Sequence, residues 1–119
     1  MMDTISPVIL KRAALRKGVV GIDTTVKLSS GTARAFAPTW DMVIGIKGGS
    51  LSEEAYTQLY KGILACIPRE VWRWLHTQGE QTGEVTVLCF CPNGKFCHTL
   101  LLMDYATQYY PDLFIKETP

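Results

Sequence analysis

The segment CFCPNGKFCH (89–98) holds three of the four cysteines and one of the two histidines of this 119-residue chain. Thiol and imidazole groups attack electrophiles, move protons and ligate soft metal ions. Three kinds of site could use such a cluster: a metal centre, a nucleophile with its base, or an anion site at a helix start. A buried strand that leads into a buried helix is the structural alternative.

A metal site would draw on four ligands, Cys89, Cys91, Cys97 and His98. Structural zinc centres need four ligands in tetrahedral geometry, commonly supplied by C-x2-C pairs. The spacing here is not C-x2-C, and the sequence offers no second pair. Adjacent helical residues also point about 100° apart, so Cys97 and His98 do not easily ligate one ion. Metal is therefore the weaker alternative, and the cofactor stays unknown.

Cys97 is the candidate nucleophile. A helix is expected to begin near it, and the positive end of a helix favours the thiolate form of cysteine. A nucleophile also needs a base within hydrogen-bond reach. Because His98 should face elsewhere on a helix, Asp23 or Asp41 from another segment could serve as that base. The predicted catalytic residues are Asp23, Cys97 and His98.

Burial is the competing explanation for the cysteines. Free cysteine is among the residue types most often found inside proteins. On this interpretation Cys66, Cys89 and Cys91 are small apolar side chains of a helix and a strand. His76, near the end of a predicted helix, is expected to be incidental.

An anion site is the third interpretation. In PNGKFCH (92–98) a glycine turn and a lysine precede a helix start, where backbone N–H groups bind phosphate, although the segment is not a P-loop. KLSSGTAR (27–34) supplies a second set of hydroxyl and cationic groups. A tryptophan just beyond it can stack on a base or close the core. The predicted ligand-binding residues are Lys27, Ser29, Ser30, Arg34, Trp40, Asp41 and Lys95.

The strands and helices that would position these segments can be predicted from the periodicity of apolar residues and from helix- and strand-breaking residues. Ser50 and Glu53 have the spacing of a capping box. The run EVTVLCF is apolar on both faces, as is typical of a central strand covered on both sides. The pattern predicts strands at 6–10, 18–26, 84–90 and 112–117 and helices at 50–67, 68–78 and 96–109.

This order of elements predicts one α/β domain over 1–119, with a mostly parallel central sheet flanked by helices. Ligands of such sheets bind beyond the carboxyl ends of the strands. The two strongest predicted strands are followed by polar loops. The sequence therefore places the site between loops 27–41 and 91–98.

The amino-acid composition narrows the classes of partner that the protein could bind. The apolar fraction of 47% and the charged fraction of 19% are typical of a globular protein. A net charge of +1 does not support a nucleic-acid partner, although four basic residues cluster at 11–17. No apolar run approaches the ~20 residues that cross a bilayer, and the first residues lack the order of a secretory signal. We expect a cytoplasmic protein with reduced thiols and no membrane contact.

Two segments resemble the domain of unknown function family 488. VTVLCFCPNGKFCHTLLLMDYA (85–106) resembles its C-terminal signature, an apolar strand ending in Cys, a short turn, and Cys-His-Arg opening a helix. GIDTTVK (21–27) and FAPTWDMVIGIKGGSLSEEAYTQLYKGIL (36–64) resemble a small subgroup met in phages and bacteria. The likeness covers roughly 18–110.

The resemblance implies a compact α/β domain with the Cys-His pair near a site, and a role in nucleotide or nucleic-acid metabolism. One position departs from the family: Thr99 stands where the family has arginine. A grip on phosphate would then pass to Lys95 or Arg34, and a degenerate, binding-only member is an alternative. The matching positions are Asp23, Lys27, Pro38, Trp40, Asp41, Tyr56, Cys89, Cys97 and His98.

The function predicted from the sequence is binding of a nucleotide or other phosphorylated small molecule, with Asp23, Cys97 and His98 acting on it. One alternative is a phage-type sequestering or inhibitory protein that only captures its ligand. Another is a metal-dependent, nucleic-acid-associated domain. One of the tryptophans at 72 and 74 should lie on the surface, so a homodimer is also left open.

Overall fold

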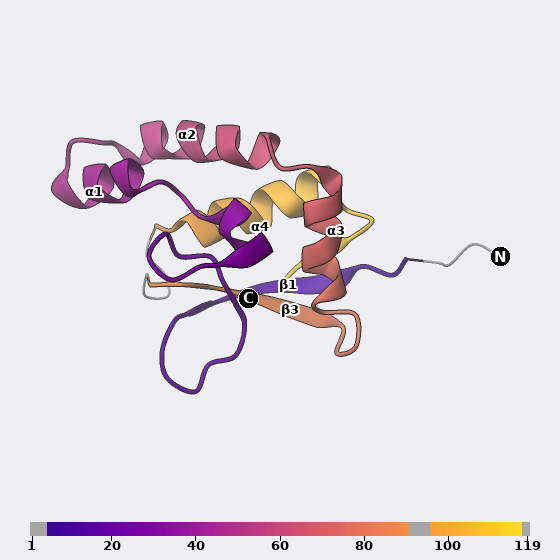
Figure 1. The fold of residues 1–119 in the computed structure, drawn as a ribbon. Helices are drawn as coiled ribbons and strands as arrows, with labels where there is room; N and C mark the ends of the chain where they lie inside the picture. Colours follow the sequence, from indigo (N-terminus) through magenta and orange to yellow (C-terminus); the bar gives the residue numbers. More distant parts are fainter. Residues whose placement is uncertain (1–4, 91–95, 118–119) are drawn as a thin grey trace.

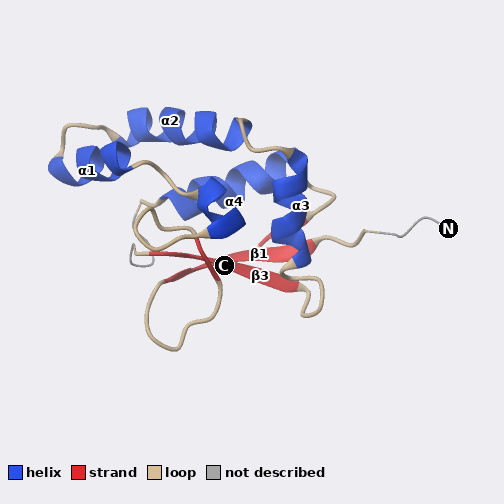
Figure 2. Cartoon of the chain, in the orientation of Figure 1, coloured by secondary structure: helices blue, strands red, loops and turns tan. Residues whose placement is uncertain are grey.

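The computed structural model describes residues 5–90 and 96–117, and residues 1–4, 91–95 and 118–119 lie outside the description. Two strands are followed by four consecutive helical elements, and the chain then continues as strand, helix and strand (Figures 1 and 2). The elements are β1 (Val8–Ala14), β2 (Ile22–Asp23), the 3-10 helix η1 (Gly31–Phe36), α1 (Trp40–Gly48), α2 (Glu53–Ala65), α3 (Arg69–Thr77), β3 (Glu84–Cys89), α4 (His98–Tyr109) and β4 (Phe114–Lys116).

The four strands form one sheet in the order β2-β3-β1-β4, and every pair is parallel. Leu10 of β1 lies opposite Val85 of β3, and Ile22 of β2 lies opposite Val87. The predicted α/β fold with a parallel central sheet is confirmed. Because β2 and β3 are parallel neighbours, the segments that follow them leave the same edge of the sheet, as the sequence predicts.

The first strand is longer than predicted and the second is shorter. The strand expected at 6–10 continues to Ala14 and lies between β3 and β4. The strand expected at 18–26 is reduced to Ile22–Asp23, and Val20 is 90% exposed. Gly18 has a φ of +88°, which ends extended structure there. The β-branched composition of 18–26 therefore predicted one long strand, whereas the chain forms a turn followed by the short strand β2.

The helices lie on one side of the sheet (Figure 1). Val85 and Val87 face that side and are buried in the core. Leu88 points to the opposite side, where the chain at Gly21 covers it rather than a helix: a Cβ added at Gly21 would lie 3.0 Å from the Leu88 side chain. Ile9 on the same side is 40% exposed. This asymmetry directs the functional groups toward the helical layer.

Helix α1 begins at the end of the predicted loop 27–41 and continues through residues for which the sequence analysis predicted no helix. Thr39 caps it by accepting a hydrogen bond from the Met42 backbone N–H (3.2 Å), and Gly49 ends it in the left-handed region at φ 81°. Both are regular helix boundary signals. Helix α2 is capped by Ser52, which accepts from Ala55 N–H (3.0 Å), and not by the predicted Ser50.

Trp72 is the centre of the aromatic core. Its side chain is fully buried, with ring centroids 4.9 Å from Phe36 and 5.7 Å from Tyr105. Tyr60 adds a buried hydroxyl that donates to the Phe36 carbonyl at 2.6 Å. These contacts fix η1 against α2, α3 and α4. Trp74 is only partly buried, in keeping with the expectation that one of the two tryptophans packs inside.

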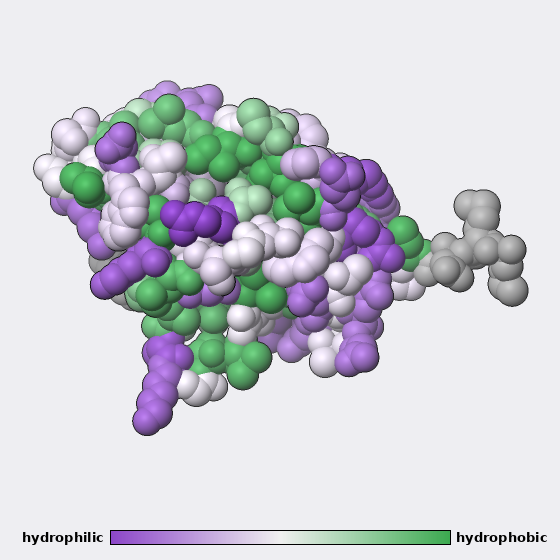
Figure 3. Space-filling view, viewed as in Figure 1, coloured by the Kyte–Doolittle hydropathy of each residue, from purple (hydrophilic) through white to green (hydrophobic). Residues whose placement is uncertain are grey.

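Within the described ranges 5–90 and 96–117, no helix is both long and apolar enough to cross a membrane. The space-filling view shows apolar side chains among polar ones over α1 and α2 (Figure 3). Ile44 and Leu59 on these helices are 64% and 51% exposed.

Two glycines give a matched test of this packing. A Cβ at Gly79 would lie 2.8 Å from the Glu84 carbonyl oxygen, so Gly79→Ala should force the end of α3 away from β3. We expect a loss of about 1–3 kcal/mol in the free energy of unfolding. Gly62 in α2 has open space at the same position, and Gly62→Ala should gain about 0.5–1 kcal/mol. Urea unfolding followed by circular dichroism measures both changes; equal stability of the two variants would contradict the close contact.

Candidate functional site

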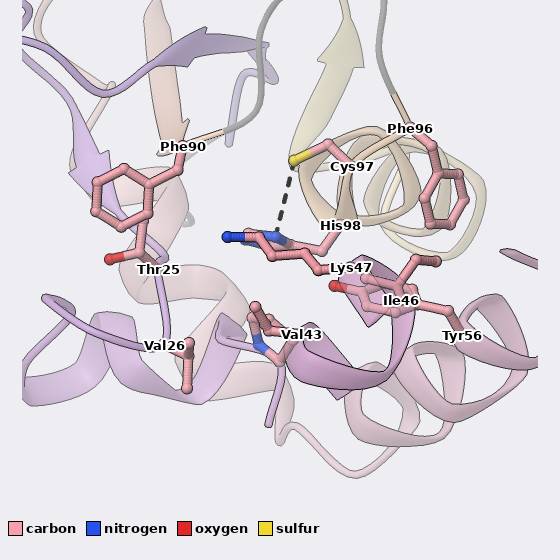
Figure 4. A pocket seen from close by; sticks show the side chains of 11 residues that line it. Thr25, Val26, Val43, Ile46, Lys47, Tyr56, Phe90, Phe96, Cys97 and His98 are labelled. Atoms are coloured by element: carbon pink, nitrogen blue, oxygen red, sulfur yellow. Dashed lines mark hydrogen bonds between the residues drawn. The ribbon is translucent and has the colours of Figure 1, made fainter. Parts of the chain in front are cut away.

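A pocket of about 250 Å³ opens where β2, β3 and the start of α4 meet α1 (Figure 4). Its wall is mostly apolar, with a thiol, an imidazole and one lysine among the lining groups. The pocket lies beyond the carboxyl ends of parallel strands, where α/β proteins bind ligands. The lining residues are Thr25, Val26, Pro38, Val43, Ile46, Lys47, Tyr56, Phe90, Phe96, Cys97 and His98.

Cys97 and His98 contact each other at this pocket. The Cys97 Sγ lies 3.8 Å from the His98 Nδ1, and both residues are nearly inaccessible to bulk solvent. The sequence analysis expected neighbouring helical residues to point apart. Cys97, however, is the N-cap of α4 and has extended backbone angles (φ −157°, ψ 148°), so helical geometry does not separate the pair.

Thr24 fixes the orientation of the His98 ring. Its hydroxyl donates to the Leu88 carbonyl at 2.8 Å and lies 2.9 Å from His98 Nε2. Since the hydroxyl proton is committed to the carbonyl, the ring donates its Nε2–H to Thr24. The Nδ1 lone pair is then left facing Cys97, where it can accept the thiol proton. Thr24 was not among the predicted site residues.

Burial keeps His98 neutral. The pKa of His98 falls from 6.5 to about 4, mainly because burial disfavours the charged ring, and the charge of Arg12 lowers it as well. The charges of Cys89 and Asp23 oppose this shift without reversing it. Around pH 7 the ring is therefore an uncharged hydrogen-bond acceptor toward Cys97.

Arg12 is a site residue that the sequence analysis placed only in a surface cluster. Its Nη2 donates to Cys89 Sγ at 3.0 Å, and its Nε donates to Thr99 Oγ1 at 2.9 Å. Burial lowers the pKa of Arg12, but hydrogen bonds and charge from Cys89 and Cys97 raise it above its ordinary value overall. The sequence contained a signal for this role. Side chains two positions apart on a strand point to the same face, so Arg12 of β1 shares the core-facing side with Leu10.

Thr99, the residue at the position where the resemblance leads us to expect an arginine, accepts a hydrogen bond from this guanidinium. The sequence analysis passed that role to Lys95 or Arg34. Lys95 lies outside the described residues, and Arg34 donates instead to the Ser29 carbonyl of its own loop at 3.2 Å. Among the described cations, Arg12 is the one that reaches Thr99.

The structure gathers only part of the predicted site at the pocket. Of the predicted catalytic residues, Cys97 and His98 line it, whereas Asp23 does not. The Asp23 carboxylate accepts from the Thr25 backbone N–H (2.8 Å) and hydroxyl (2.7 Å) and so orders the chain after β2. Its charge reaches His98 only at a distance.

The predicted ligand-binding residues that the structure describes, which exclude Lys95, are not part of the pocket lining. Lys27 and Ser30 are exposed, and Ser29 is buried. Trp40 and Asp41 begin α1 and are exposed. Instead, α1 contributes Lys47 to the lining, a residue that was missed because this helix was not predicted. Two other positions of the family resemblance, Pro38 and Tyr56, do line the pocket.

The remaining cysteines and histidine separate from the site in different ways. Cys89 is fully buried, as the burial interpretation predicts, whereas Cys66 is exposed at the end of α2, contrary to it. Cys91 lies outside the described residues. His76 is buried away from the pocket, and its Nε2 donates to the Ser6 carbonyl at 2.8 Å.

Metal ligation finds no support in the described residues, where no group of three or more His, Cys, Asp or Glu side chains could hold an ion. The predicted ligand set includes Cys91, which the description does not cover. Comparisons with protein-family models, curated proteins and solved structures gave no match. The resemblance to family 488 therefore stays a prediction, and the site is argued from its own geometry.

The neutral state of His98 predicts how stability depends on pH. In the unfolded chain the ring takes up a proton near pH 6.5, whereas the folded protein resists this until about pH 4. Protonation therefore favours unfolding, and the contribution of His98 is complete above pH 6.5 and lost as the pH falls to about 4. We expect a decrease of about 3 kcal/mol from this group.

Urea unfolding at a series of pH values measures that decrease. In His98→Gln the ring no longer titrates, so the fall between pH 6.5 and 4 should become shallower. Other acid-sensitive contacts, such as the ion pair between Arg69 and Asp112, remain in both proteins and give the common background. An unchanged pH dependence in His98→Gln would contradict a buried neutral ring.

Proposed function

We propose that the protein binds a small molecule with a ring-sized apolar part and an anionic group, and that Cys97 and His98 act on it. The observation that carries this proposal is the joint placement of the two side chains in the wall of an otherwise mainly apolar pocket. Nucleotides and other phosphorylated small molecules are the ligand class that the sequence predicts. They combine an aromatic ring with negative charge.

The dimensions and lining of the pocket support a compact ligand. Its volume of about 250 Å³ lies just below the ~300–1,000 Å³ usual for small-molecule sites, so it suits one ring system. Tyr56, Phe90 and Phe96 supply aromatic surface. Lys47 contributes the positive charge among the described lining residues, because His98 is neutral. We therefore assign to Lys47 the cationic contact with the anion that the sequence analysis gave to Lys27, Arg34 and Lys95.

The chemistry proposed at the site is nucleophilic attack by sulfur. As the Cys97 sulfur forms a bond to an electrophilic atom of the ligand, the bond between that atom and its leaving group breaks. The Nδ1 of His98 accepts the thiol proton and passes it to the leaving group. Thr24 holds the ring in the required tautomer. Asp23 acts as a positioning residue that orders the neighbouring loop and supplies negative charge at a distance.

Capture without turnover is the second candidate, and one observation favours it. A histidine with a pKa of about 4 is a weak base, so proton transfer from the thiol is unfavourable near pH 7. A protein of this kind would bind the ligand in the same pocket and release it unchanged. This corresponds to the sequestering or inhibitory protein considered from the sequence.

Binding can be tested by thermal unfolding with a panel of mono-, di- and cyclic nucleotides. A ligand present at 100 times its Kd should add about 2.7 kcal/mol to the free energy of unfolding and raise Tm. Lys47→Gln should weaken that increase by loss of the anion contact. Lys61→Gln, on an exposed face of α2 outside this pocket, is the matched control and should keep it. No increase with any nucleotide would overturn the predicted ligand class.

Turnover separates the two candidates. A bound nucleotide should be converted on long incubation if Cys97 acts on it, and mass spectrometry of the recovered ligand would detect the product. Cys97→Ser should retain the rise in Tm and lose the conversion, because a hydroxyl is a much weaker nucleophile than a thiolate. A ligand that is bound and recovered intact with the unaltered protein would establish capture instead.

A further inference from the structure

Two cysteine sulfurs lie close together at the start of α4. Thr99 Oγ1 is 3.3 Å from Cys97 Sγ and 3.4 Å from Cys89 Sγ, so a single hydroxyl contacts both. Cys97 lines the pocket, whereas Cys89 is fully buried at the end of β3 and does not line it. Figure 4 shows Cys97 among the side chains that line the pocket, whereas Cys89 is not part of that lining.

Arg12 places a positive charge beside both sulfurs. Its guanidinium donates a hydrogen bond to Cys89 Sγ at 3.0 Å and also forms a hydrogen bond with the Cys97 side chain. A cation in contact with sulfur favours the thiolate, which is the reactive form of cysteine. Because His98 is neutral, the stabilising charge at this site comes from the arginine rather than from an imidazolium.

We propose that Cys97 and Cys89 form a dithiol centre that reduces a small-molecule disulfide bound in the pocket. The inference rests on the proposed function, since it uses the same pocket, and it names the chemical class of the substrate. The apolar wall would receive the body of the disulfide, and Lys47 would hold an anionic group on it. The substrate is thus an anionic disulfide with a ring-sized apolar part.

The reaction consists of two thiol–disulfide exchanges. The Cys97 thiolate attacks one sulfur of R–S–S–R, forms a Cys97–S–S–R bond and expels R–S⁻. The Cys89 thiolate then attacks Cys97 Sγ, forms a Cys89–Cys97 disulfide and expels the second R–S⁻. Two electrons pass from the protein to the substrate, and the two cysteine protons leave with the two product thiols. An external dithiol, such as dithiothreitol, returns the protein to its reduced form.

Both sulfurs are buried, and their positions relative to the pocket fit these separate roles, because Cys97 belongs to the lining and Cys89 does not. An attacking thiol has to be reached by the substrate, whereas a resolving thiol only has to reach the first sulfur. Because both sulfurs contact the Thr99 hydroxyl, formation of the bond of about 2.05 Å requires the two side chains to turn toward each other and the hydroxyl to move aside. Arg12 remains beside both positions and can stabilise whichever thiolate is present.

The probe for this proposal is 5,5′-dithiobis(2-nitrobenzoate), an aromatic disulfide with carboxylate groups whose product absorbs visible light. A Cys66→Ser, Cys91→Ser background removes the other two thiols. We expect two thionitrobenzoate ions per protein, and peptide mapping should find the Cys89–Cys97 disulfide. With Cys89→Ser added, one ion should be released and the mixed disulfide on Cys97 should persist. Mapping the unaltered protein after the same treatment serves as a check independent of the background.

Substitutions of Arg12 and Lys47 should change the exchange rate or its pH dependence in ways that a purely structural role of these residues would not produce. Arg12→Gln should slow the first exchange roughly tenfold at neutral pH and shift its pH–rate profile upward, with partial rescue by Arg12→Lys. Lys11→Gln, on the opposite face of β1, should leave the rate unchanged. Lys47→Gln should slow the anionic probe but not the uncharged 2,2′-dithiodipyridine.

Three results would overturn the dithiol centre: a Cys97 adduct that persists although Cys89 is present, a disulfide that joins Cys97 to another cysteine, or equal rates in Cys97→Ser and its parent. Loss of the nucleotide-dependent rise in Tm has a different meaning. If the exchange proceeds while no nucleotide binds, the nucleotide proposal fails and the dithiol centre stands. If a nucleotide binds and no Cys89–Cys97 bond forms, the dithiol centre fails and the binding proposal stands.

Discussion

Parallel pairing of β3 with β1 on one side and β2 on the other is the constraint on which the site depends. It brings Arg12, Thr24 and Cys89 to one edge of the sheet, although they come from distant parts of the sequence. Side chains alternate between faces of a strand, so a slip of one residue between β1 and β3 would turn Arg12 away from the helices. The buried apolar residues Leu10 and Val85 hold the register, and the polar groups beyond them are aligned as a result.

The site combines two groups that are both cationic when protonated, and they differ in protonation within it. The imidazole of His98 loses its proton because it is enclosed, whereas the guanidinium of Arg12 keeps its charge beside sulfur. An arginine remains protonated in surroundings that neutralise a histidine. The side chain next to Cys97 in the sequence is thus the hydrogen-bond acceptor, and the cation arrives from another strand.

Local patterns in the sequence were sufficient to place part of this site. The apolar run of β3 and the breaker before α4 put Cys97 at a helix start, and that placement holds. The pairing of Cys97 with His98 was missed because both were treated as helical, whereas an N-cap residue has extended geometry. Lys47 was missed because the signals of α1, a threonine cap and a terminal glycine, are short and lack a strong apolar period.

The contacts of Arg12 and Thr24 could not be deduced in the same way, since they depend on which strands pair. The sequence ended the first strand at residue 10, two positions before Arg12, and this removed the alternation that points it into the core. Asp23 was predicted as a catalytic residue and candidate base, but its hydrogen bonds are made within its own turn. Composition identified polar groups near the site; only the tertiary pairing decided which of them face it.

The position of β1 has a consequence for how the chain reaches its native state. This strand is synthesised early, yet its main partner, β3, begins at Glu84, and its other neighbour, β4, begins at Phe114. Until those residues leave the ribosome, the polar edges of β1 have no strand to pair with, and loops of great length must close before the sheet forms. The sheet can therefore form only after Phe114–Lys116 have been synthesised, and the unpaired β1 is the segment most in need of protection until then.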